Sequence, residues 1–529
     1  MIVPMARGRA LVAAAASGAL LALSLPSYDL WPLAWFGLVP LLLAIRGRTP
    51  AGAFGVAWVG WLVFSLLALY WIAPTISNFT SISRPLSIGV LILLCMTSAV
   101  YVGVFGAALE WIAAAGISRV LAAPCLWVVV EWTRTFFPAA FPWALLGYSQ
   151  YRVLPVVQIA DLFAIYGVTA VLVFVNAGLA EIVRDGVRRH ASLATAMILL
   201  VVSVVGYGAV RLSVIDTRTP TDQLEVGVAQ GNIPQDEKWD PENEDTTLVH
   251  YLELSDRAAA AGARLIVWPE AAVPFFLGGD RRAIHLARLS DRTGTWLLVG
   301  APGYERRDDG VARQYNQAWM VAPDNGLVGA YDKIELVPFG EYIPFGFLTS
   351  WVGTAVEAVG QFGRGVAPVV FDGPPMGAGD RARPVGVGPL ICYEGIFPDL
   401  TRRFVADGAD VLVNISNDAW YGRTSAPYQH LAMAAVRAIE NRVPLVRATN
   451  TGISALVDPS GRIRSRTALF ETAVFVDSVG VGGGGSLYTR IGDVLVYTMI
   501  GAIAVLAYLR IRLGSVLIRG DAPASEPPA

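Results

Sequence analysis

The chain has 529 residues, of which 54% are hydrophobic and only 16% charged, and its net charge is −2. Soluble globular proteins carry about 25% charged residues, so this composition excludes an ordinary soluble protein. The absence of a basic excess argues against a nucleic-acid partner. Apolar residues are concentrated in two regions, 1–213 and 490–513, whereas 220–485 has the composition of a globular domain.

Eight apolar runs are candidates for membrane-spanning helices, because a helix of about 20 residues crosses the hydrocarbon core of a bilayer. They lie at about 10–26, 31–45, 53–73, 86–114, 118–133, 160–183, 193–212 and 491–511. The second run is short enough to be re-entrant, and the first is interpreted as a retained anchor since further spans follow it directly. We therefore expect a membrane domain of about seven helices over 1–213 and a last span within 490–513.

Arginines near the ends of these runs are mostly in the segments that would lie on the same side of the membrane as the N-terminus. The positive-inside rule then predicts that both termini are cytoplasmic. Seven spans before the globular block would place residues 220–485 on the outer side of the membrane. The last residues, 520–529, are rich in Pro, Ala and Ser, and we expect a disordered cytoplasmic tail.

The globular block alternates short apolar runs with amphipathic stretches, which is typical of a layered α/β fold. The expected strands are Leu224–Ala229, Leu265–Trp268, Trp296–Gly300, Ala318–Val321, Val385–Ile391, Val411–Ile415 and Leu445–Ala448. The expected helices lie at about 241–261, 280–292, 397–407 and 427–442. In such folds the catalytic residues lie just past strand ends.

Cys392 directly follows one of these expected strands, and the other two cysteines of the chain, Cys95 and Cys125, lie in apolar runs. A disulfide could form on the outer side of the membrane, but Cys392 has no second cysteine in its domain to pair with. The same block also contains both lysines of the chain, Lys238 and Lys333. A thiol, scarce ammonium groups and well-placed carboxylates together indicate covalent catalysis.

The thiol needs a base, and among the four histidines only His430 could pair with Cys392. A metal centre is disfavoured, since the sequence has no His-x-x-x-His motif, no cysteine pair and no close Asp/His cluster. Glu270 ends the run Leu-Ile-Val-Trp-Pro-Glu. Reference pKa values of about 4.3 for Glu and 8.5 for Cys are poorly matched, but burial raises that of a carboxyl and a nearby ammonium lowers that of a thiol. The sequence therefore predicts a Glu–Lys–Cys trio.

Three motifs in order, Trp268-Pro-Glu270, the stretch from Lys333 to Glu341, and Cys392-Tyr393-Glu394, resemble the nitrilase superfamily. With the apolar runs and the stretches 141–150, 230–232, 417–422 and 450–454, the whole chain resembles the bacterial apolipoprotein N-acyltransferases. This resemblance implies a multi-span α-helical membrane domain with an inserted nitrilase-like αββα sandwich. It also implies a bacterial inner membrane, with the catalytic domain in the periplasm.

The resemblance further implies roles for individual residues. Glu270 is the expected general base, Cys392 the nucleophile and Lys333 the group that stabilises the transition state. Glu341 would orient Lys333 or relay protons, while Tyr393 and Glu394 would shape the pocket. The expected substrate contacts are Trp239, Trp268, Asn417 and Trp420. No cofactor or metal is expected.

The implied reaction is ping-pong. Cys392 would take an acyl chain from a phospholipid, forming a thioester, and pass it to the α-amine of a diacylated apolipoprotein. An anchored nitrilase-type hydrolase, in which water resolves the thioester, uses the same trio. A transport or scaffold protein would instead need ionisable residues lining a path through the membrane, and Glu110 and Glu131 are the main candidates. The long loop 345–365 is expected to form a mobile gate facing the bilayer, or else to pack on the membrane domain.

Overall fold

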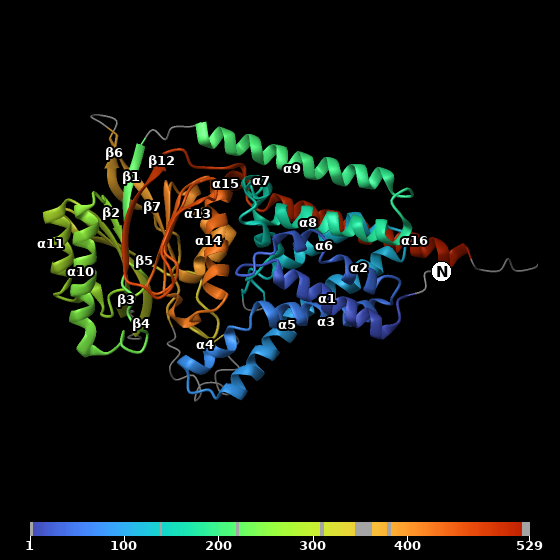
Figure 1. Ribbon diagram of the computed structural model, residues 1–529, viewed down its shortest axis with the longest axis horizontal. Coiled ribbons are helices and arrows are strands. Elements are labelled where there is room, and N and C mark those ends of the chain that lie inside the picture. Colours follow the sequence, from blue (N-terminus) through green and yellow to red (C-terminus); the bar gives the residue numbers. More distant parts are fainter. Residues whose placement is uncertain are drawn as a thin grey trace, which may run out of the picture.

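The computed structural model describes residues 4–137, 140–217, 222–306, 312–343, 362–377 and 382–520. A helical bundle and an α/β sandwich lie end to end along the long axis of the molecule (Figure 1). This arrangement confirms the predicted combination of a helical membrane domain with an inserted layered domain. The predicted gate falls mostly on residues 344–361 and the predicted tail on residues after Gly520, and both segments lie outside the described residues.

Helices from both ends of the chain form the bundle. They are α1 (Arg7–Leu23), α2 (Val39–Ile45), α3 (Pro50–Ala68), α4 (Ile72–Phe79), α5 (Arg84–Ala113), α6 (Arg119–Thr133), α7 (Leu154–Val157), α8 (Ala160–Asp185), α9 (Ala191–Thr217), α15 (Leu487–Ile491) and α16 (Val494–Gly520). In the described chain, five of them are long and apolar enough to cross a membrane: α3, α5, α8, α9 and α16. The helices α1 and α6, with 17 and 15 residues, and the run at 31–45 are shorter, so the count of eight spans stays a prediction.

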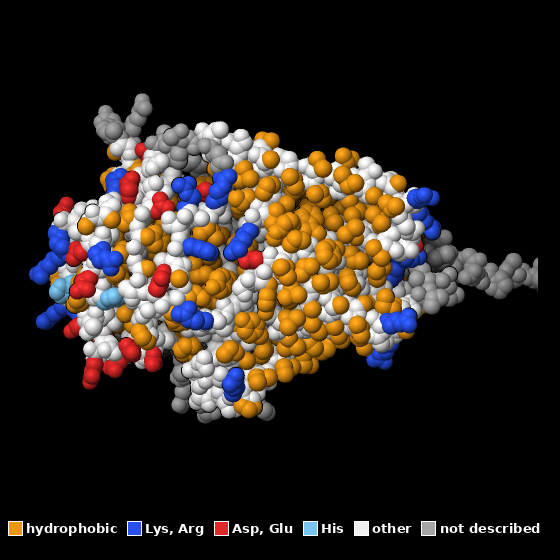
Figure 2. Space-filling model, viewed as in Figure 1, with side chains coloured by type: hydrophobic (Ala, Val, Ile, Leu, Met, Phe, Trp, Pro, Cys, Tyr) orange, Lys and Arg blue, Asp and Glu red, His pale blue; other side chains and the backbone are white. Residues whose placement is uncertain are grey.

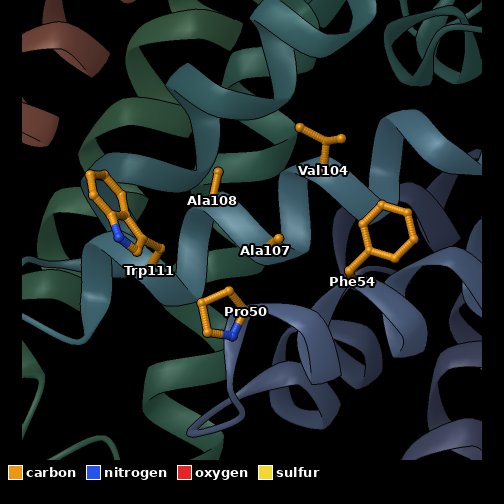
Figure 3. A pocket seen from close by; sticks show the side chains of 6 residues that line it. All are labelled: Pro50, Phe54, Val104, Ala107, Ala108 and Trp111. Carbon is orange, nitrogen blue, oxygen red and sulfur yellow. The ribbon is translucent and has the colours of Figure 1, made fainter.

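The outer surface of the bundle is apolar. Leu93, Leu199 and Val202 are each about 60% exposed, and hydrophobic side chains cover this part of the molecule in a continuous area (Figure 2). A shallow groove of about 370 Å³ between α3 and α5 is lined by Pro50, Phe54, Val104, Ala107, Ala108 and Trp111 (Figure 3). An apolar surface of this extent is stable only against lipid chains, so the bundle is a membrane domain.

Two six-stranded sheets form the sandwich. The first has the order β12-β1-β2-β3-β4-β5 and the second β11-β10-β9-β8-β7-β6. The first comprises β12 (Ala473–Val481), β1 (Asp222–Gln230), β2 (Leu265–Val267), β3 (Trp296–Arg306), β4 (Ala312–Ala322) and β5 (Gly326–Asp332). The second comprises β11 (Ile463–Arg466), β10 (Ala455–Val457), β9 (Leu445–Thr449), β8 (Val411–Ser416), β7 (Arg383–Ile391) and β6 (Phe371–Met376).

The central strands of each sheet, β1-β2-β3 and β7-β8-β9, are parallel, and the outer pairs are antiparallel. Parallel strands are covered on both faces, so their sequences are continuous apolar runs. All seven runs expected to form strands correspond to strands of the structure, although β2 ends at Val267, one residue before the predicted end at Trp268.

Helices α10 (Glu244–Ala260) and α11 (Ala283–Thr293) cover the outer face of the first sheet, and α13 (Pro398–Ala406) and α14 (Ala426–Asn441) lie between the second sheet and the bundle (Figure 1). The αββα prediction is therefore confirmed. Every residue of α14 except Tyr428 is buried, because one side packs on the sheet and the other on the bundle.

Polar contacts join α14 to the bundle along its length. Gln429 accepts a hydrogen bond from Nε1 of Trp143 at 2.7 Å, and Glu440 accepts one from the amide of Ile165 at 2.8 Å. Just past the helix, Arg442 forms an ion pair with Asp161 at 2.7 Å. Since these groups are buried, each contact fixes the position of the sandwich on the bundle.

Candidate active site

Four of the predicted site residues follow the carboxyl ends of strands from both sheets. Glu270 comes after β2 and Lys333 after β5 in the first sheet, while Cys392 comes after β7 and Asn417 after β8 in the second. Because the two sheets face each other, these strand ends meet and bring residues far apart in the sequence into one buried site.

Cys392 sits at a sharp bend between β7 and the short helix η7 (Cys392–Ile396). Its φ angle of 50° lies in the left-handed region, which costs energy for a residue with a side chain. Its carbonyl oxygen accepts hydrogen bonds from Nδ2 of Asn414 at 3.2 Å and from Nε2 of His430 at 3.1 Å. These two donors hold the bend and fix the direction in which the buried thiol points.

Glu270 and Lys333 are in direct contact, with Oε1 of the carboxylate 3.5 Å from Nζ. Nζ also forms a shorter ion pair with Oε1 of Glu341 at 2.8 Å. The amide of Asn316 donates to both carboxylates, at 2.7 Å to Glu270 and 3.1 Å to Glu341. The second oxygen of Glu270 accepts from the backbone amide of Asn417 at 2.9 Å. The predicted base is thus held in one orientation by both sheets.

The charges around Lys333 decide its protonation. Burial alone would lower its pKa, but the attraction of Glu341 and Glu270 outweighs burial and raises the pKa above its ordinary value. Lys333 is therefore a permanent cation inside the site, flanked by two carboxylates. A fixed buried charge of this kind can stabilise an oxyanion without reorganising when the reaction occurs.

The thiol of Cys392 differs from the sequence-based expectation. Burial, followed by the charge of Glu270, raises its pKa, and the lowering effect of Lys333 is too small to compensate. The expected lowering effect of the ammonium is present, but burial of the sulfur outweighs it. The sulfur is a neutral thiol at rest, and its proton has to leave as the bond to carbon forms.

Glu394 has a supporting position, with both carboxylate oxygens fully used. Oε1 accepts from the hydroxyl of Tyr331 at 2.7 Å and from the amides of Ile334 and Glu335 at 2.6 and 3.2 Å. Oε2 accepts from the amide of Ile391 at 2.7 Å. Burial raises the pKa of Glu394 to about 7. This one side chain links the backbone after Lys333 to the backbone before Cys392.

Lys238 belongs to the same site, although its role was not predicted. Its Nζ is buried and donates to the backbone carbonyl of Glu270 at 3.0 Å. Burial lowers the pKa of Lys238 to about 8, while Glu270 and Cys392 act in the opposite direction. The scarcity of lysine in the sequence was the available signal, since both lysines of the chain have their ammonium groups beside Glu270.

A second buried network lies behind the sulfur. The hydroxyl of Ser416 is 3.4 Å from Sγ of Cys392 and 2.9 Å from Oδ1 of Asp418. Asp418 is paired with Arg447 at 2.9 Å. Burial and the charge of Arg447 lower the pKa of His430, so its ring is neutral and its Nε2 carries the proton that the Cys392 carbonyl accepts. His430 thus contacts the backbone of Cys392, and the side chain that reaches the sulfur is Ser416.

The three tryptophans predicted to contact substrate differ in their exposure to solvent. Trp239 is 48% exposed beside Lys238, and the ring of Trp420 meets Phe79 of α4 at a centroid distance of 4.9 Å. Trp268 is fully buried, stacks on Tyr251 and donates to Ser255 of α10 at 2.7 Å. The indole is thus a core residue close to Glu270, and its contact with substrate stays a prediction.

Tyr393 connects the nucleophile to the membrane domain. Its hydroxyl donates to the carbonyl of Ala140 at 2.6 Å, and its ring stacks against Phe141. Nearby, the rings of Trp71, Trp143 and Tyr421 form an aromatic cluster between the bundle and the sandwich. The indole N–H of Trp71 is buried without a partner in the described chain. Residues of the membrane domain therefore pack against the segment that carries the nucleophile.

The two intramembrane carboxylates considered from the sequence are structural. Glu110 pairs with Arg119 at 2.7 Å, and Glu131 accepts from Trp127, Thr169 and the amide of Leu146. Such closed networks do not line a path across the membrane.

Among the described residues, one group of side chains could hold a metal ion, against the sequence-based expectation of no Asp/His cluster. It consists of Glu181, Asp185 and His190, whose ligand atoms lie within 4.8 Å of one another. The group is at the end of α8, and Glu181 is already paired with Arg46 at 2.6 Å. It lies in the bundle rather than beside Cys392.

Family models match both parts of the chain. Residues 225–480 match the carbon-nitrogen hydrolase family, and residues 17–178 match the apolipoprotein N-acyltransferase N-terminal domain. The apolipoprotein N-acyltransferase of Geobacter metallireducens is 41% identical over 509 residues, covering 94% of this chain and 95% of its own. That of Brucella melitensis is 35% identical, covering 89% of each chain.

The chain belongs to the apolipoprotein N-acyltransferases. It is a membrane enzyme of the carbon-nitrogen hydrolase superfamily. Among solved structures, the NitN amidase of Nesterenkonia is 20% identical with a TM-score of 0.37, covering 52% of this chain and 98% of its own. Saccharomyces cerevisiae Nit3 is 17% identical with the same TM-score, covering 50% of this chain and 92% of its own.

Proposed function

We propose that this apolipoprotein N-acyltransferase works by a ping-pong mechanism through a thioester on Cys392. The contact that carries the proposal is the buried Glu270–Lys333 pair, which places a proton acceptor and a permanent cation beside a neutral thiol. A phospholipid is the acyl donor, and the α-amine of a diacylated apolipoprotein is the acceptor.

In the first half-reaction, Sγ of Cys392 attacks the ester carbonyl of the phospholipid while Glu270 takes the thiol proton. Lys333 stabilises the negative charge that develops on the carbonyl oxygen, and Glu341 keeps Lys333 oriented. The bond between the carbonyl carbon and the ester oxygen then breaks. Glu270 returns the proton to the departing oxygen, and lysophospholipid leaves.

In the second half-reaction, the amine of the apolipoprotein attacks the thioester carbonyl and gives a proton to Glu270. The carbon–sulfur bond breaks, an amide forms and the sulfur regains a proton. One residue acts as base and acid in both halves, which requires the fixed orientation that Asn316 and Asn417 impose on Glu270.

The proposed site also requires contact with lipid. The hydroxyl of Tyr393, next to the nucleophile, donates a hydrogen bond to Ala140 of the membrane domain, and the ring of Trp420 packs on Phe79 of α4. We place the catalytic domain in the periplasm of a bacterial inner membrane, with both termini in the cytoplasm. The beginning of α1 and the end of α16 lie together at the end of the bundle away from the sandwich, which supports this topology (Figure 1).

The full-length protein, incubated with a phospholipid carrying a labelled acyl chain, should accumulate a hydroxylamine-sensitive adduct. Cys392→Ser should not accumulate it, whereas Cys125→Ser, which removes a thiol within α6, should behave as the parent does. Addition of a diacylated lipopeptide should move the label to its amine. Release of the label only as free fatty acid would show the hydrolase reaction instead.

A further inference from the structure

A basic groove lies where the sandwich meets the bundle. Its volume is about 470 Å³, and it is lined by Tyr151, Arg152, Leu154, Gly461, Arg462, Ile463, Arg464 and Arg466. The first three precede α8, and the others lie in and before the edge strand β11. The groove is thus formed jointly by the two parts of the molecule.

Two arginines of this groove, Arg464 and Arg466, lie on the strand β11, and Arg462 directly precedes it. Arg464 and Arg466 are the two exposed positions in the alternating burial pattern of this strand. Ser465, between two of them, turns the other way and donates to Asp477 at 2.6 Å. The backbone positions of Arg464 and Arg466 are about 7 Å apart along the strand, a spacing that lets both long side chains approach one phosphate group.

The positive charge of the groove is only partly neutralised. Arg152 pairs with Asp29 at 3.1 Å and remains half exposed, and Arg462 donates to Ser460. Arg464 and Arg466 are exposed and form no ion pair with any described residue. A phosphate oxygen would satisfy planar guanidinium donors that now face water.

The groove lies at the level expected for lipid headgroups. Asp29, which holds Arg152, belongs to a loop in which Tyr28, Leu30 and Trp31 are 51%, 49% and 40% exposed. Exposed aromatic residues at the end of a transmembrane bundle are typical of the interface between membrane and water. Basic side chains lie along the edge of the apolar surface at this end of the bundle (Figure 2).

The groove is separate from the site of acyl transfer. His430, near the start of α14, contacts Cys392, whereas Ile439, two and a half turns later, packs against Gly461 of the groove. At 1.5 Å per residue, these two positions on α14 are about 14 Å apart. A lipid held in the groove would therefore not occupy the thiol.

We propose that this groove binds the headgroup of an anionic phospholipid in the leaflet adjoining the catalytic domain. The guanidinium groups of Arg464 and Arg466 hold the phosphate, and the loop 28–31 contacts the acyl chains. Bound lipid would stabilise the joint between bundle and sandwich, since Arg152 and β11 come from opposite sides of it. The alternative role for arginines on an edge strand is to prevent the strand from pairing with another chain. The following experiment separates the two roles.

The full-length protein is reconstituted into phosphatidylcholine nanodiscs with trace spin-labelled phosphatidylglycerol or phosphatidylcholine, and the motionally restricted fraction is measured. The parent protein should prefer phosphatidylglycerol, and Arg464→Gln/Arg466→Gln should reduce this preference roughly fivefold for each arginine removed. Raising the salt concentration should weaken the preference in the parent protein.

The matched control is Arg281→Gln/Arg288→Gln, which removes two exposed arginines in and beside α11, at the end of the molecule far from the bundle. It should retain the lipid preference of the parent. Retained preference in the Arg464/Arg466 variant, with or without self-association, would overturn the proposal, as would a parent protein that does not discriminate between the two lipids.

Discussion

The ammonium of Lys238 lies 3.0 Å from the backbone carbonyl oxygen of Glu270. This contact positions the residue proposed as base, and a hydrogen bond from a charged donor contributes about 1.5–3 kcal/mol. Lys238→Met should therefore lower the rate of adduct formation by roughly 10- to 100-fold. Glu237→Gln, at the exposed neighbouring position, should leave the rate unchanged. Equal rates of adduct formation for Lys238→Met and the parent would show that Lys238 does not position Glu270.

The same lysine should give a dependence on pH. Its pKa of about 8 in the folded protein lies below the unfolded value, so the buried charge lowers stability below pH 8 and this cost disappears as the pH rises towards the unfolded pKa. The change in Tm caused by Lys238→Met should therefore be more favourable at pH 7 than at pH 10. The parent should also lose activity as the pH rises through about 8, and thermal melting and rate profiles of both proteins check these expectations.

Ser416 has one hydroxyl proton and two acceptors, Sγ of Cys392 and Oδ1 of Asp418. Donation to the sulfur favours its anionic form, so Ser416→Ala should slow alkylation of Cys392 by iodoacetamide by roughly tenfold. Ser465→Ala removes a hydroxyl from the edge of the same sheet and serves as the control. A shift of the pH profile of alkylation to higher pH would distinguish loss of the donor from loss of folding; an unshifted profile would contradict the role.

Asp418→Asn should destabilise the protein by about 3–5 kcal/mol, because it leaves the fully buried Arg447 without its counter-charge. Burial alone would raise the pKa of Asp418, but the charge of Arg447 holds it well below its ordinary value. The stabilisation is therefore present above pH about 4 and is lost as the pH falls below it. The Tm difference from the parent should stay constant between pH 7 and 4 and narrow in stronger acid.

Glu394→Gln replaces one of two acceptor oxygens by an NH2 group. Since Oε1 and Oε2 together accept from Tyr331, Ile334, Glu335 and Ile391, at least one buried donor loses its partner, at a cost of about 1–3 kcal/mol. Hydrogen exchange should accelerate in the backbone after Lys333 and before Cys392, and kcat should fall more than KM rises. Glu242→Gln, an exposed substitution, controls for charge; unchanged exchange would show that Glu394 does not couple the two segments.

The sequence predicted the central strands and the trio because both depend on local patterns. Continuous apolar runs identify buried parallel strands, and Glu270 and Cys392 directly follow such runs. The edge strands β5, β6, β11 and β12, and β10 next to an edge, were not predicted, since they are half-exposed or short and lack a clear apolar run.

What sequence reasoning missed depends on contacts between distant segments. Asn316 lies beside Glu270 because β4 and β2 belong to the first sheet, and Ser416 lies beside Cys392 because β8 and β7 are neighbours in the second. Arg447 lies inside a run counted as apolar, and nothing local shows that Asp418 neutralises it. The net pKa of Cys392 likewise could not be predicted, because it is set by how completely the folded site excludes water.

Helix α14 is buried both against the second sheet and against the bundle. It is therefore a layer of the sandwich and a wall of the membrane domain at the same time. The ribosome makes α1–α9 long before α14, and α16 after it. Since one hydrophobic core runs through both parts, the sandwich cannot bury this layer completely until the bundle packs against it, which makes formation of the membrane domain a step in the assembly of the catalytic site.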